Sequence, residues 1–467
     1  MGTLRERLSG LRSFKRGIHP PHRKKYSESA PIQAFVPTGD LLIPLSQHIG
    51  APCKPTIKPR EEVTFGQKIA DIDHPISAPI HAPAAGKTGM ATMTLLPGPG
   101  GRRCEAIPIK LAADGEAIPP DFFEQFLSRD WTSADPSRYE PEEIVQKIRE
   151  AGLVGMGGAT FPTYFKLKQN PDRPVDTVVL NGAECEPYLT ADHRLMVECP
   201  EAIVVGLQLA QRAAGAQRAI VAIEENKPDA IDAMRAAIKD RPGMEVVVCA
   251  AKYPMGGERQ LIPAVLDRVV PSAPKGLPLD VGVVVTNVAT AHGIARAVVK
   301  DQPFTHRVVT VTGLGVKTPG NWLVPIGTSF RELIERCAGG VTNQAVKVLA
   351  GGPMMGPTVP TLDVPVVKGV GGITVMIDEE TAHWDEQPCI RCGRCIDNCP
   401  LYLSPTKIAH AVKHREYELA NEYDMQACCE CGCCAFVCPA EIPLAQYIRA
   451  GKNQWRLLQI QKKAASG

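Results

Sequence analysis

Apolar and polar positions along the middle of the chain predict helices and strands in turn. Short apolar runs that end in polar residues predict four buried strands, over residues 177–180, 219–223, 244–249 and 281–285. Helical spacing predicts three helices, over residues 142–151, 201–213 and 228–239. Because alternating helices and strands build an open sheet with helices packed on it, we expect an α/β domain over residues 138–300.

Polar residues follow each of the predicted strands. They are Asn181, Glu184 and Glu186 after the first strand, Glu224 after the second, residues 256–258 after the third and Asn287 after the fourth. Open α/β sheets bind their ligands beyond the carboxyl ends of the strands. The pattern therefore predicts that these side chains converge on one polar site.

Before this domain, residues 41–115 read as short strands interrupted by proline and glycine. Two phrases, at residues 58–70 and 77–86, resemble the barrel-sandwich fold of biotinyl and lipoyl carriers. A carrier presents a modifiable lysine on the hairpin between these phrases, whereas here that place holds residues 71–75, which include no lysine. We therefore expect a barrel-sandwich domain that serves as a scaffold and not as a swinging arm.

After the α/β domain, residues 305–360 predict a hairpin-like pair of strands, a helix over 330–337 and a further strand. Thr328 or Ser329 is the expected N-cap of that helix. This order resembles the soluble-ligand-binding β-grasp (SLBB) module. Residues 369–377 read as a connection to the following domain, and a last helix is expected over 447–463, within a helical tail at 446–467.

Eight cysteines near the carboxyl end repeat one spacing, Cys-x2-Cys-x2-Cys-x3-Cys-Pro, within residues 380–445. The first run is Cys389, Cys392, Cys395 and Cys399, and the second is Cys428, Cys431, Cys434 and Cys438. Such runs bind two 4Fe-4S clusters in a bacterial ferredoxin-type α domain, and the fourth cysteine of each run ligates the cluster of the other run. We therefore expect Cys438 with the first three cysteines and Cys399 with the second three.

A zinc site is the alternative interpretation, since Cys-x2-Cys pairs also form tetrahedral thiolate sites. The duplicated three-cysteine spacing with its Cys-Pro ending fits clusters better. Cys429 and Cys433 lie off the ligand register, and we expect them to be small buried neighbours of the clusters.

Charge and the lengths of apolar runs limit the binding partners and the cellular locations that we expect for the chain. The net charge is +2, which argues against a nucleic-acid partner held by bulk charge. The first 25 residues are basic without an apolar core, so they do not form a secretory signal, and no apolar run reaches about 18 residues. Basic residues of the expected N-terminal arm (1–40), Lys24 among them, could contact anionic lipid or an acidic partner, although a solvated arm is the plainer interpretation.

A glycine-rich stretch at residues 151–166 is the most suggestive chemistry outside the cysteines. Gly155, Gly157 and Gly158 follow a predicted helix, so the stretch matches neither the Rossmann nor the Walker pattern. Glycines at these positions let the backbone approach a flat ring or a phosphate with its N–H groups as donors. A tight turn is the alternative.

This loop resembles the flavin-binding loop of the NADH-oxidising subunit of respiratory complex I, where a glycine-rich run leads into Phe-Pro-Thr and a lysine, here Phe161 to Thr163 and Lys166. Residues 181–187 and 286–290 resemble two further segments of that flavoprotein. The order barrel sandwich, flavin α/β domain, β-grasp and double ferredoxin resembles that of the RnfC family, the C component of Rnf electron-transport complexes, over nearly the whole chain.

The resemblance implies which residues form each site. The FMN site would use Gly155, Gly157, Gly158, Lys166, Asn181, Glu184, Glu186 and Asn287. Phe161 and Glu184 would meet the nicotinamide of NADH and act as the catalytic pair. Complex I has a carboxylate where this chain has Ala183, and Gly-Glu-Glu where this chain has Gly256, Gly257 and Glu258; Glu258 remains a candidate cofactor contact.

The function implied is NADH oxidation by a peripheral subunit on the cytoplasmic face of a bacterial inner membrane. Electrons would pass from NADH through FMN to two 4Fe-4S clusters, then to the ferredoxin-like B component and integral membrane subunits of the complex, with ferredoxin as an indirect partner. FMN is required between NADH and the clusters, because NADH gives electrons in pairs and each cluster accepts one electron at a time. The alternatives are a cobalamin reductase of the propanediol-utilisation type and a non-enzymatic iron-sulfur relay. The cysteines exclude the related A component of the sodium-translocating quinone reductase.

Overall fold

The computed structural model describes residues 10–98, 101–112, 117–274, 276–381 and 385–466. The chain forms two compact units, each built from separated stretches of sequence. One contains Met1–Pro21, Val248–Val281 and Ala382–Gly467, and the other contains His22–Val247 and Gly282–Thr381. The sheets and the glycine loop belong mainly to the second unit, and the repeated cysteines belong to the first.

The expected α/β sheet has the strand order β12-β11-β10-β13. Its strands are β10 (Thr177–Gly182), β11 (Arg218–Glu224), β12 (Met244–Cys249) and β13 (Val283–Asn287). Strand β10 pairs in parallel with both β11 and β13, so their carboxyl ends share one edge. All four strands were predicted from the sequence, within two residues at both ends.

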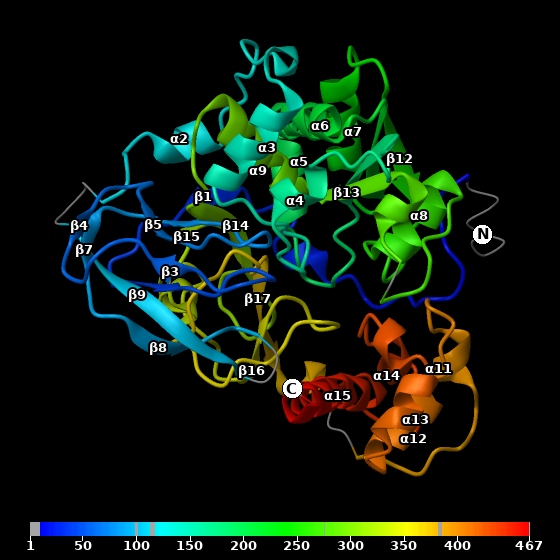
Figure 1. The fold of residues 1–467 in the computed structure, drawn as a ribbon. Coiled ribbons are helices and arrows are strands. Elements are labelled where there is room, and N and C mark those ends of the chain that lie inside the picture. The colour runs from blue at the N-terminus through cyan, green and yellow to red at the C-terminus, as the bar shows by residue number, and fades with distance from the viewer. Residues whose placement is uncertain (1–9, 99–100, 113–116, 275, 382–384, 467) are drawn as a thin grey trace. The chain divides into compact units, whose positions relative to one another are not determined.

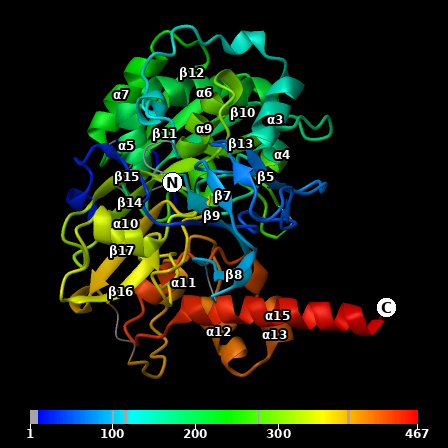
Figure 2. The same ribbon diagram turned by 90° about the vertical axis from the view of Figure 1, so that its left-hand side faces the viewer.

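Helices pack on this sheet as the apolar periodicity predicted. The predicted helices are α3 (Pro141–Glu150), α6 (Pro200–Ala214) and α7 (Pro228–Ile238), whereas α5 (Ala191–Glu198) and α9 (Val288–Val299) were not predicted. Helices α6 and α9 lie side by side and both pack on β10 (Figures 1 and 2). Their approach is close, because a Cβ at Gly206 of α6 would meet the carbonyl of Ala291 in α9 at 1.7 Å.

The barrel-sandwich domain consists of two small antiparallel sheets. One has the order β2-β9-β7-β4, with β8 also on β9, and the other has the order β3-β5-β6. Apolar side chains including Leu41, Ile43, Ile69 and Ile109 fill the core between them, each fully buried. The strands are β2 (Leu41–Pro44), β3 (Lys54–Pro55), β4 (Glu62–Val63), β5 (Lys68–Asp71), β6 (Ile80–His81), β7 (Gly86–Thr88), β8 (Thr92–Leu95) and β9 (Arg103–Leu111).

The β-grasp sheet has the order β1-β15-β14-β17-β16. Its strands are β1 (Ile32–Ala34), β14 (His306–Thr312), β15 (Gly320–Pro325), β16 (Ala345–Ala350) and β17 (Gly372–Ile377). Strand β17 lies between β14 and β16, so the interpretation of this segment as a connection is wrong. Helix α10 (Phe330–Arg336) begins after Ser329, whose hydroxyl accepts the N–H of Glu332, so Ser329 is the cap.

The cysteine-containing unit combines its helices with the described N-terminal residues and with the segment from Val248 to Val281. Its helices are α8 (Glu258–Leu266), α11 (Arg394–Asp397), α12 (Pro405–Lys413), α13 (Tyr417–Glu422), α14 (Cys433–Phe436) and α15 (Leu444–Ser466). Helix α15 begins three residues before the predicted start, packs on α12, and extends beyond α12 and α13 at its carboxyl end (Figure 2).

Two hydrogen bonds tie the stretches of this unit together. The buried hydroxyl of Tyr253 donates to the carbonyl of Cys431 at 2.8 Å, and the amide of Gln260 donates to the carbonyl of Pro400 at 3.2 Å. Within the described residues, no helix is both long and apolar enough to cross a membrane. The remaining elements are α2 (Phe122–Phe126), α4 (Thr163–Leu167) and short 3-10 helices at Lys24–Tyr26, Pro136–Arg138, Pro278–Val281, Asp378–Glu380 and Met425–Ala427.

Candidate functional site

The glycine loop leaves α3 and is closed at its base by the backbone. The N–H of Gly155 donates to the carbonyl of Phe161 at 2.8 Å, and Val154 and Pro162 form an isolated β-bridge. The N–H of Met156 donates to the hydroxyl of Thr290 in α9 at 2.9 Å, which anchors the loop to that helix. The stem is therefore fixed by partners on both sides.

The tip of the loop presents its backbone without side chains. The N–H groups of Gly157 and Gly158 make no hydrogen bond within the part of the chain that the structure describes. A Cβ at Gly157 would lie 3.2 Å from the Cβ of Asn287, whereas Gly158 faces open space and has a φ of +128° that disfavours other residues. Two N–H donors beside open space form a surface that can accept a flat, polar ligand.

Two asparagines mark the carboxyl edge of the sheet next to this loop. Asn181 on β10 and Asn287 on β13 are register partners. The Asn287 oxygen accepts the N–H of Thr290 at 3.3 Å and caps α9, while its amide nitrogen donates to Asp192 at 2.6 Å. The structure thus brings Asn181 and Asn287 together, as the strand ends predicted, and places Gly157 of the glycine loop beside Asn287.

Glu184 lies beside this edge but has a defined partner of its own. Its two carboxylate oxygens accept the N–H groups of Asp192 at 2.7 Å and His193 at 3.1 Å, and so they cap the first turn of α5. Burial, and next the Glu184 carboxylate, raise the pKa of Asp192 to about 7. Asp192 was not predicted as a residue of this site, because it lies on α5, a helix that was not predicted.

Glu186 faces the loop after β16. Its carboxylate accepts the N–H groups of Met354 at 3.2 Å and Met355 at 2.7 Å. Burial raises the pKa of Glu186 to about 7. A Cβ at Gly352 would lie 2.4 Å from this carboxylate, so the close contact requires glycine there.

Lys166 and Phe161 lie on or next to α4. The Lys166 ammonium donates to the carbonyl of Val285, near the end of β13, at 2.7 Å. Phe161 packs edge-on against Phe165, whose side chain is 42% exposed. Glu258, by contrast, is the first residue of α8 and belongs to the unit that contains the cysteines.

Two buried lysines support the segment after β10, and no local sequence pattern indicated either. The Lys24 ammonium donates to the carbonyls of Glu184, Glu186 and Leu189 at 2.7, 3.1 and 2.6 Å. The interpretation of Lys24 as part of a surface arm is therefore wrong, since its side chain is buried. Burial lowers the pKa of Lys24.

The second of these lysines is Lys227, just before α7. Its ammonium donates to the carbonyl of Ala183 at 2.6 Å and forms a fully buried ion pair with Glu224 at 3.3 Å. Glu224 was predicted to face the polar site, but in the structure it is 1% exposed and pairs with this lysine. Glu224 therefore compensates the buried charge of Lys227, whose ammonium supports the segment at Ala183. The expectation that Glu224 reaches the site is wrong.

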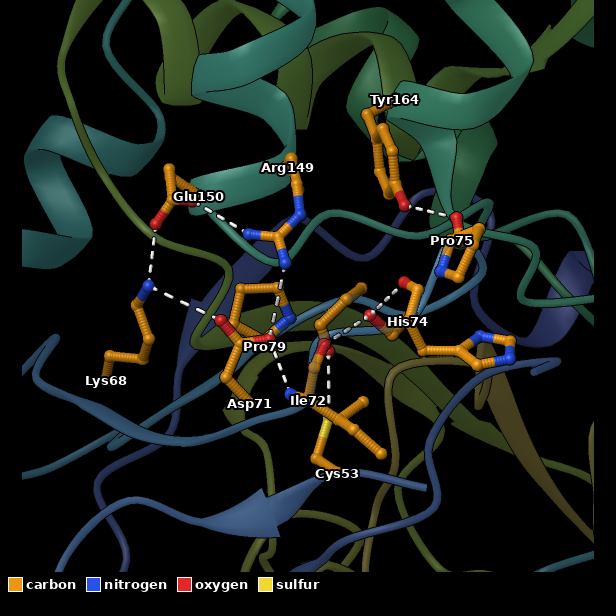
Figure 3. A network of polar contacts seen from close by, with 12 residues as sticks. Cys53, Lys68, Asp71, Ile72, His74, Pro75, Pro79, Arg149, Glu150 and Tyr164 are labelled. Atoms are coloured by element: carbon orange, nitrogen blue, oxygen red, sulfur yellow. Dashed lines mark hydrogen bonds and ion pairs between the residues drawn. The ribbon is translucent and has the colours of Figure 1, made fainter. Parts of the chain in front are cut away.

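The barrel-sandwich hairpin is fixed against the helices that flank the glycine loop (Figure 3). Lys68 pairs with Glu150 of α3 at 2.6 Å, and the Tyr164 hydroxyl of α4 donates to the carbonyl of Pro75 at 2.5 Å. A third buried lysine, Lys368, donates to the carbonyls of Pro79 at 2.7 Å and Gly152 at 2.6 Å. These contacts agree with a scaffold, because a swinging hairpin would leave them unmade.

The cysteines of the two runs interleave. Cys399 of the first run lines one cavity with Cys428, Cys431 and Cys434 of the second. Cys438 of the second run packs against an apolar group of side chains that includes Cys395 of the first run and Cys434 of the second. Cys389 and Cys392 are exposed. Cys433 is buried as expected, whereas Cys429 is exposed, so the expectation of a buried neighbour is wrong for Cys429.

Known family models match four separate parts of the chain. The Nuo51 FMN-binding domain matches residues 148–296, and the RnfC barrel sandwich hybrid domain matches residues 12–115. The SLBB domain matches residues 308–358, and a 4Fe-4S binding domain matches residues 381–405. Fold and site therefore define an electron-transfer protein with a flavin-binding domain and an iron-sulfur domain.

Relatives that align with most of the chain give the family. The C component of the proton-translocating ferredoxin:NAD(+) oxidoreductase complex of Clostridium ljungdahlii is 43% identical over 97% of this chain and 96% of the relative. The Na(+)-translocating counterpart of Acetobacterium woodii is 40% identical over 85% of this chain and 86% of the relative. The C component of the ion-translocating oxidoreductase complex of Rhodobacter capsulatus is 40% identical over 96% of this chain and 84% of the relative. The chain belongs to the RnfC family, the C components of ion-translocating oxidoreductase complexes.

A solved structure shares the fold. A chain of an NAD+-reducing [NiFe]-hydrogenase aligns with a TM-score of 0.51 at 21% identity, over 70% of this chain and 64% of that chain. At this identity the match supports the fold and no particular activity.

Proposed function

We propose that the chain is the NADH-oxidising peripheral subunit of a membrane-bound, ion-translocating NADH:ferredoxin oxidoreductase. Its relatives are subunits of ferredoxin:NAD(+) oxidoreductase complexes, and its domains match FMN-binding and 4Fe-4S binding families. These matches do not favour a cobalamin reductase or a relay without flavin. The complexes of the first two relatives are named for different ions, protons and Na(+), so family membership leaves the coupling ion open.

The observation that carries the flavin assignment is the fixed loop with a bare tip. Gly157 and Gly158 offer backbone donors beside Asn287, at the carboxyl edge where an α/β sheet collects its ligands. Two buried hydroxyls, those of Thr163 after the loop and Thr286 before Asn287, have no partner within the described residues. The residues present therefore fit a ligand with polar edges.

In this site, Gly155, Gly157 and Gly158 would bring the backbone to the ring, and Asn181 and Asn287 would fix its polar edge. Bound FMN takes up a hydride as an electron pair and releases electrons singly. Phe161 would cover the nicotinamide of NADH. Lys166 would have to exchange its bond to Val285 in order to meet a phosphate.

The acidic residues have unequal roles in this proposal. Glu184 acts at the nicotinamide end while its carboxylate caps α5, and Glu186 orients the loop after β16. Glu258 remains a proposed cofactor contact on the resemblance alone. The carboxylates near the site also repel the anionic parts of a nucleotide, so contacts to its phosphates must come from N–H groups and from lysine.

We propose crossed ligation for the two clusters. Cys428, Cys431, Cys434 and Cys399 would hold one, since all four line one cavity and, unlike Cys429 and Cys433 beside them, lie in the ligand spacing. Cys389, Cys392, Cys395 and Cys438 would hold the other, and its exposed Cys389 and Cys392 place it near the surface, where a partner can receive electrons. We further propose that the partners are the ferredoxin-like B component and the integral membrane subunits of the complex, on the cytoplasmic face.

The purified chain tests this function through its flavin, iron and spectrum. We expect one FMN, about eight iron atoms and bleaching by NADH in stopped-flow absorbance. Gly157→Val should abolish flavin binding, because its side chain would extend into Asn287, and should leave iron content unchanged. Gly98→Val is the control, since Gly98 has open space around its Cβ position. Full flavin content and normal NADH bleaching in Gly157→Val would contradict the site and favour a flavin-free relay.

A further inference from the structure

One stretch outside the repeated cysteines contacts them within the same unit. It covers residues 253–260, and we call it the collar. Its first residue is held in place, because Ile18 and Tyr253 form a β-bridge closed by two backbone hydrogen bonds of 2.9 Å. Tyr253 and Gln260, at the two ends of the collar, are each 2% exposed. The proposed function uses neither side chain.

These two buried side chains donate to two different ligand loops. The Tyr253 hydroxyl donates to the carbonyl of Cys431 at 2.8 Å, and the Gln260 amide donates to the carbonyl of Pro400 at 3.2 Å. Pro400 directly follows Cys399, so one of these loops belongs to the first cysteine run and the other to the second. The collar therefore joins the two halves of the crossed ligand set.

Both acceptor residues border one site. Cys431 and Pro400 line the cavity that Cys399, Cys428 and Cys434 also line. Four thiols in the ligand spacing on one cavity are the donor set of a 4Fe-4S cluster, so the residues present fit that group. The two hydrogen bonds of the collar thus end at the wall of the proposed cluster site.

The collar compensates carbonyl oxygens beside a site that gains negative charge. Reduction of a bound cluster adds one electron, so the reduced form is the more negative one. A buried carbonyl oxygen without its donor is an uncompensated negative dipole end, which disfavours that form. Lys452 of α15 also donates, to the carbonyl of Cys428 at 2.8 Å, but its charge is paired with Glu430 at 2.9 Å.

Outer hydrogen-bond partners orient the ligands of a metal site and tune its potential. We propose that Tyr253 and Gln260 are positioning residues that set the midpoint potential of the cluster held by Cys399, Cys428, Cys431 and Cys434. This inference rests on the proposed binding of 4Fe-4S clusters. The effect is expected at this cluster alone, because both acceptor residues line its cavity.

Redox titrations of the full, cofactor-loaded chain, followed by EPR, test the inference. The wild type, Tyr253→Phe and Tyr164→Phe are compared, and Cys399→Ser and Cys438→Ser assign the signals to the two clusters. Tyr164→Phe is the matched control, since it also removes a hydroxyl that donates to a backbone carbonyl, that of Pro75, but in the other unit.

We expect Tyr253→Phe to lower the midpoint potential of the second-run cluster and to leave that of the other cluster unchanged. The equilibrium constant for reduction should fall by up to about tenfold, which is 59 mV for one electron. Tyr164→Phe should match the wild type at both clusters. An unchanged second-run midpoint in Tyr253→Phe, or an equal shift at both clusters, would overturn the inference.

The spectrum of the wild type keeps this inference separate from the proposed function. A wild type without iron-sulfur signals would overturn both, whereas full signals with an unchanged midpoint in Tyr253→Phe would overturn only the role of the collar. Should Tyr253→Phe fail to hold the cluster, Gln260→Leu replaces it. The same direction of shift is expected, because the carbonyl of Pro400 then loses its donor.

Discussion

Replacing Lys24 by methionine should release the segment from Glu184 to Leu189, although Lys24 lies 160 residues earlier in the chain. Its ammonium makes three hydrogen bonds of 2.6 to 3.1 Å to carbonyls of that segment. Methionine has a similar length and no donor, so the three carbonyls lose their partner inside the protein. The segment carries Glu184 and Glu186, so its release should also weaken the proposed flavin site.

The expected loss of local opening free energy follows from the number of these hydrogen bonds and from their burial. Hydrogen bonds to a charged group contribute about 1.5–3 kcal/mol each. The sum of the three bond contributions overestimates the loss of local stability in Lys24→Met, because methionine avoids the desolvation cost of the buried ammonium. Removing one partner of a buried charged interaction costs about 3–5 kcal/mol, and we take this range for the local opening free energy.

Hydrogen exchange measures local opening directly. The N–H of Tyr188 donates to the carbonyl of His22, and the N–H of Thr190 donates to the Thr310 hydroxyl, so both amides report on the segment. A loss of about 3–5 kcal/mol corresponds to roughly 100- to 4,000-fold faster exchange at these amides. Lys25→Met is the matched control, since Lys25 is exposed. Exchange in Lys24→Met within a few-fold of Lys25→Met would refute the reasoning.

Two further predictions concern Asp192 and the cluster ligands. Because burial and Glu184 raise the pKa of Asp192 to about 7, the folded chain keeps a proton that the unfolded chain loses near pH 4, and this stabilisation is lost as the pH rises to 7. Asp192→Asn should therefore match the wild-type thermal midpoint near pH 4, where folded and unfolded wild type both keep the proton, and exceed it at pH 8; a constant difference at both pH values would contradict the assignment. Cys399→Ser should damage mainly the cluster of the second run and Cys438→Ser mainly that of the first, as read by EPR; damage confined to the mutated run would mean that ligation is not crossed.

The sequence predicted the α/β strands well because each is a short apolar run followed by polar residues. Helix α9 was missed for a physical reason. It begins at Val288, directly after β13 ends at Asn287, and nearly all of its side chains are buried. A helix that is apolar on all sides shows no helical period, so the strand and the helix read as one apolar run.

The site was predictable only in part. The glycines became candidates because their loop resembles a known flavin-binding loop, and Asn287 because it follows a predicted strand in a segment that resembles the same flavoprotein. Lys24 could not, since lysine is ordinarily exposed and its partners lie more than 150 residues away. Strand β17 was missed in the same way, because its pairing with β14 and β16 is set by tertiary contacts that leave no local signal.

Three buried lysines together explain how the flanking domains contribute to the site. Lys24 comes from the N-terminal segment, Lys227 precedes α7, and Lys368 precedes β17 of the β-grasp sheet. Lys24 and Lys227 donate to carbonyls of the loop after β10, at Glu184 and Ala183 respectively. Lys368 donates to the carbonyl of Gly152 in the glycine loop. Loops otherwise have few fixed partners and open easily. Because two of these ammonium groups come from segments on either side of the flavin-domain match, the geometry of the loops depends on the N-terminal and β-grasp segments as well as on the α/β sheet.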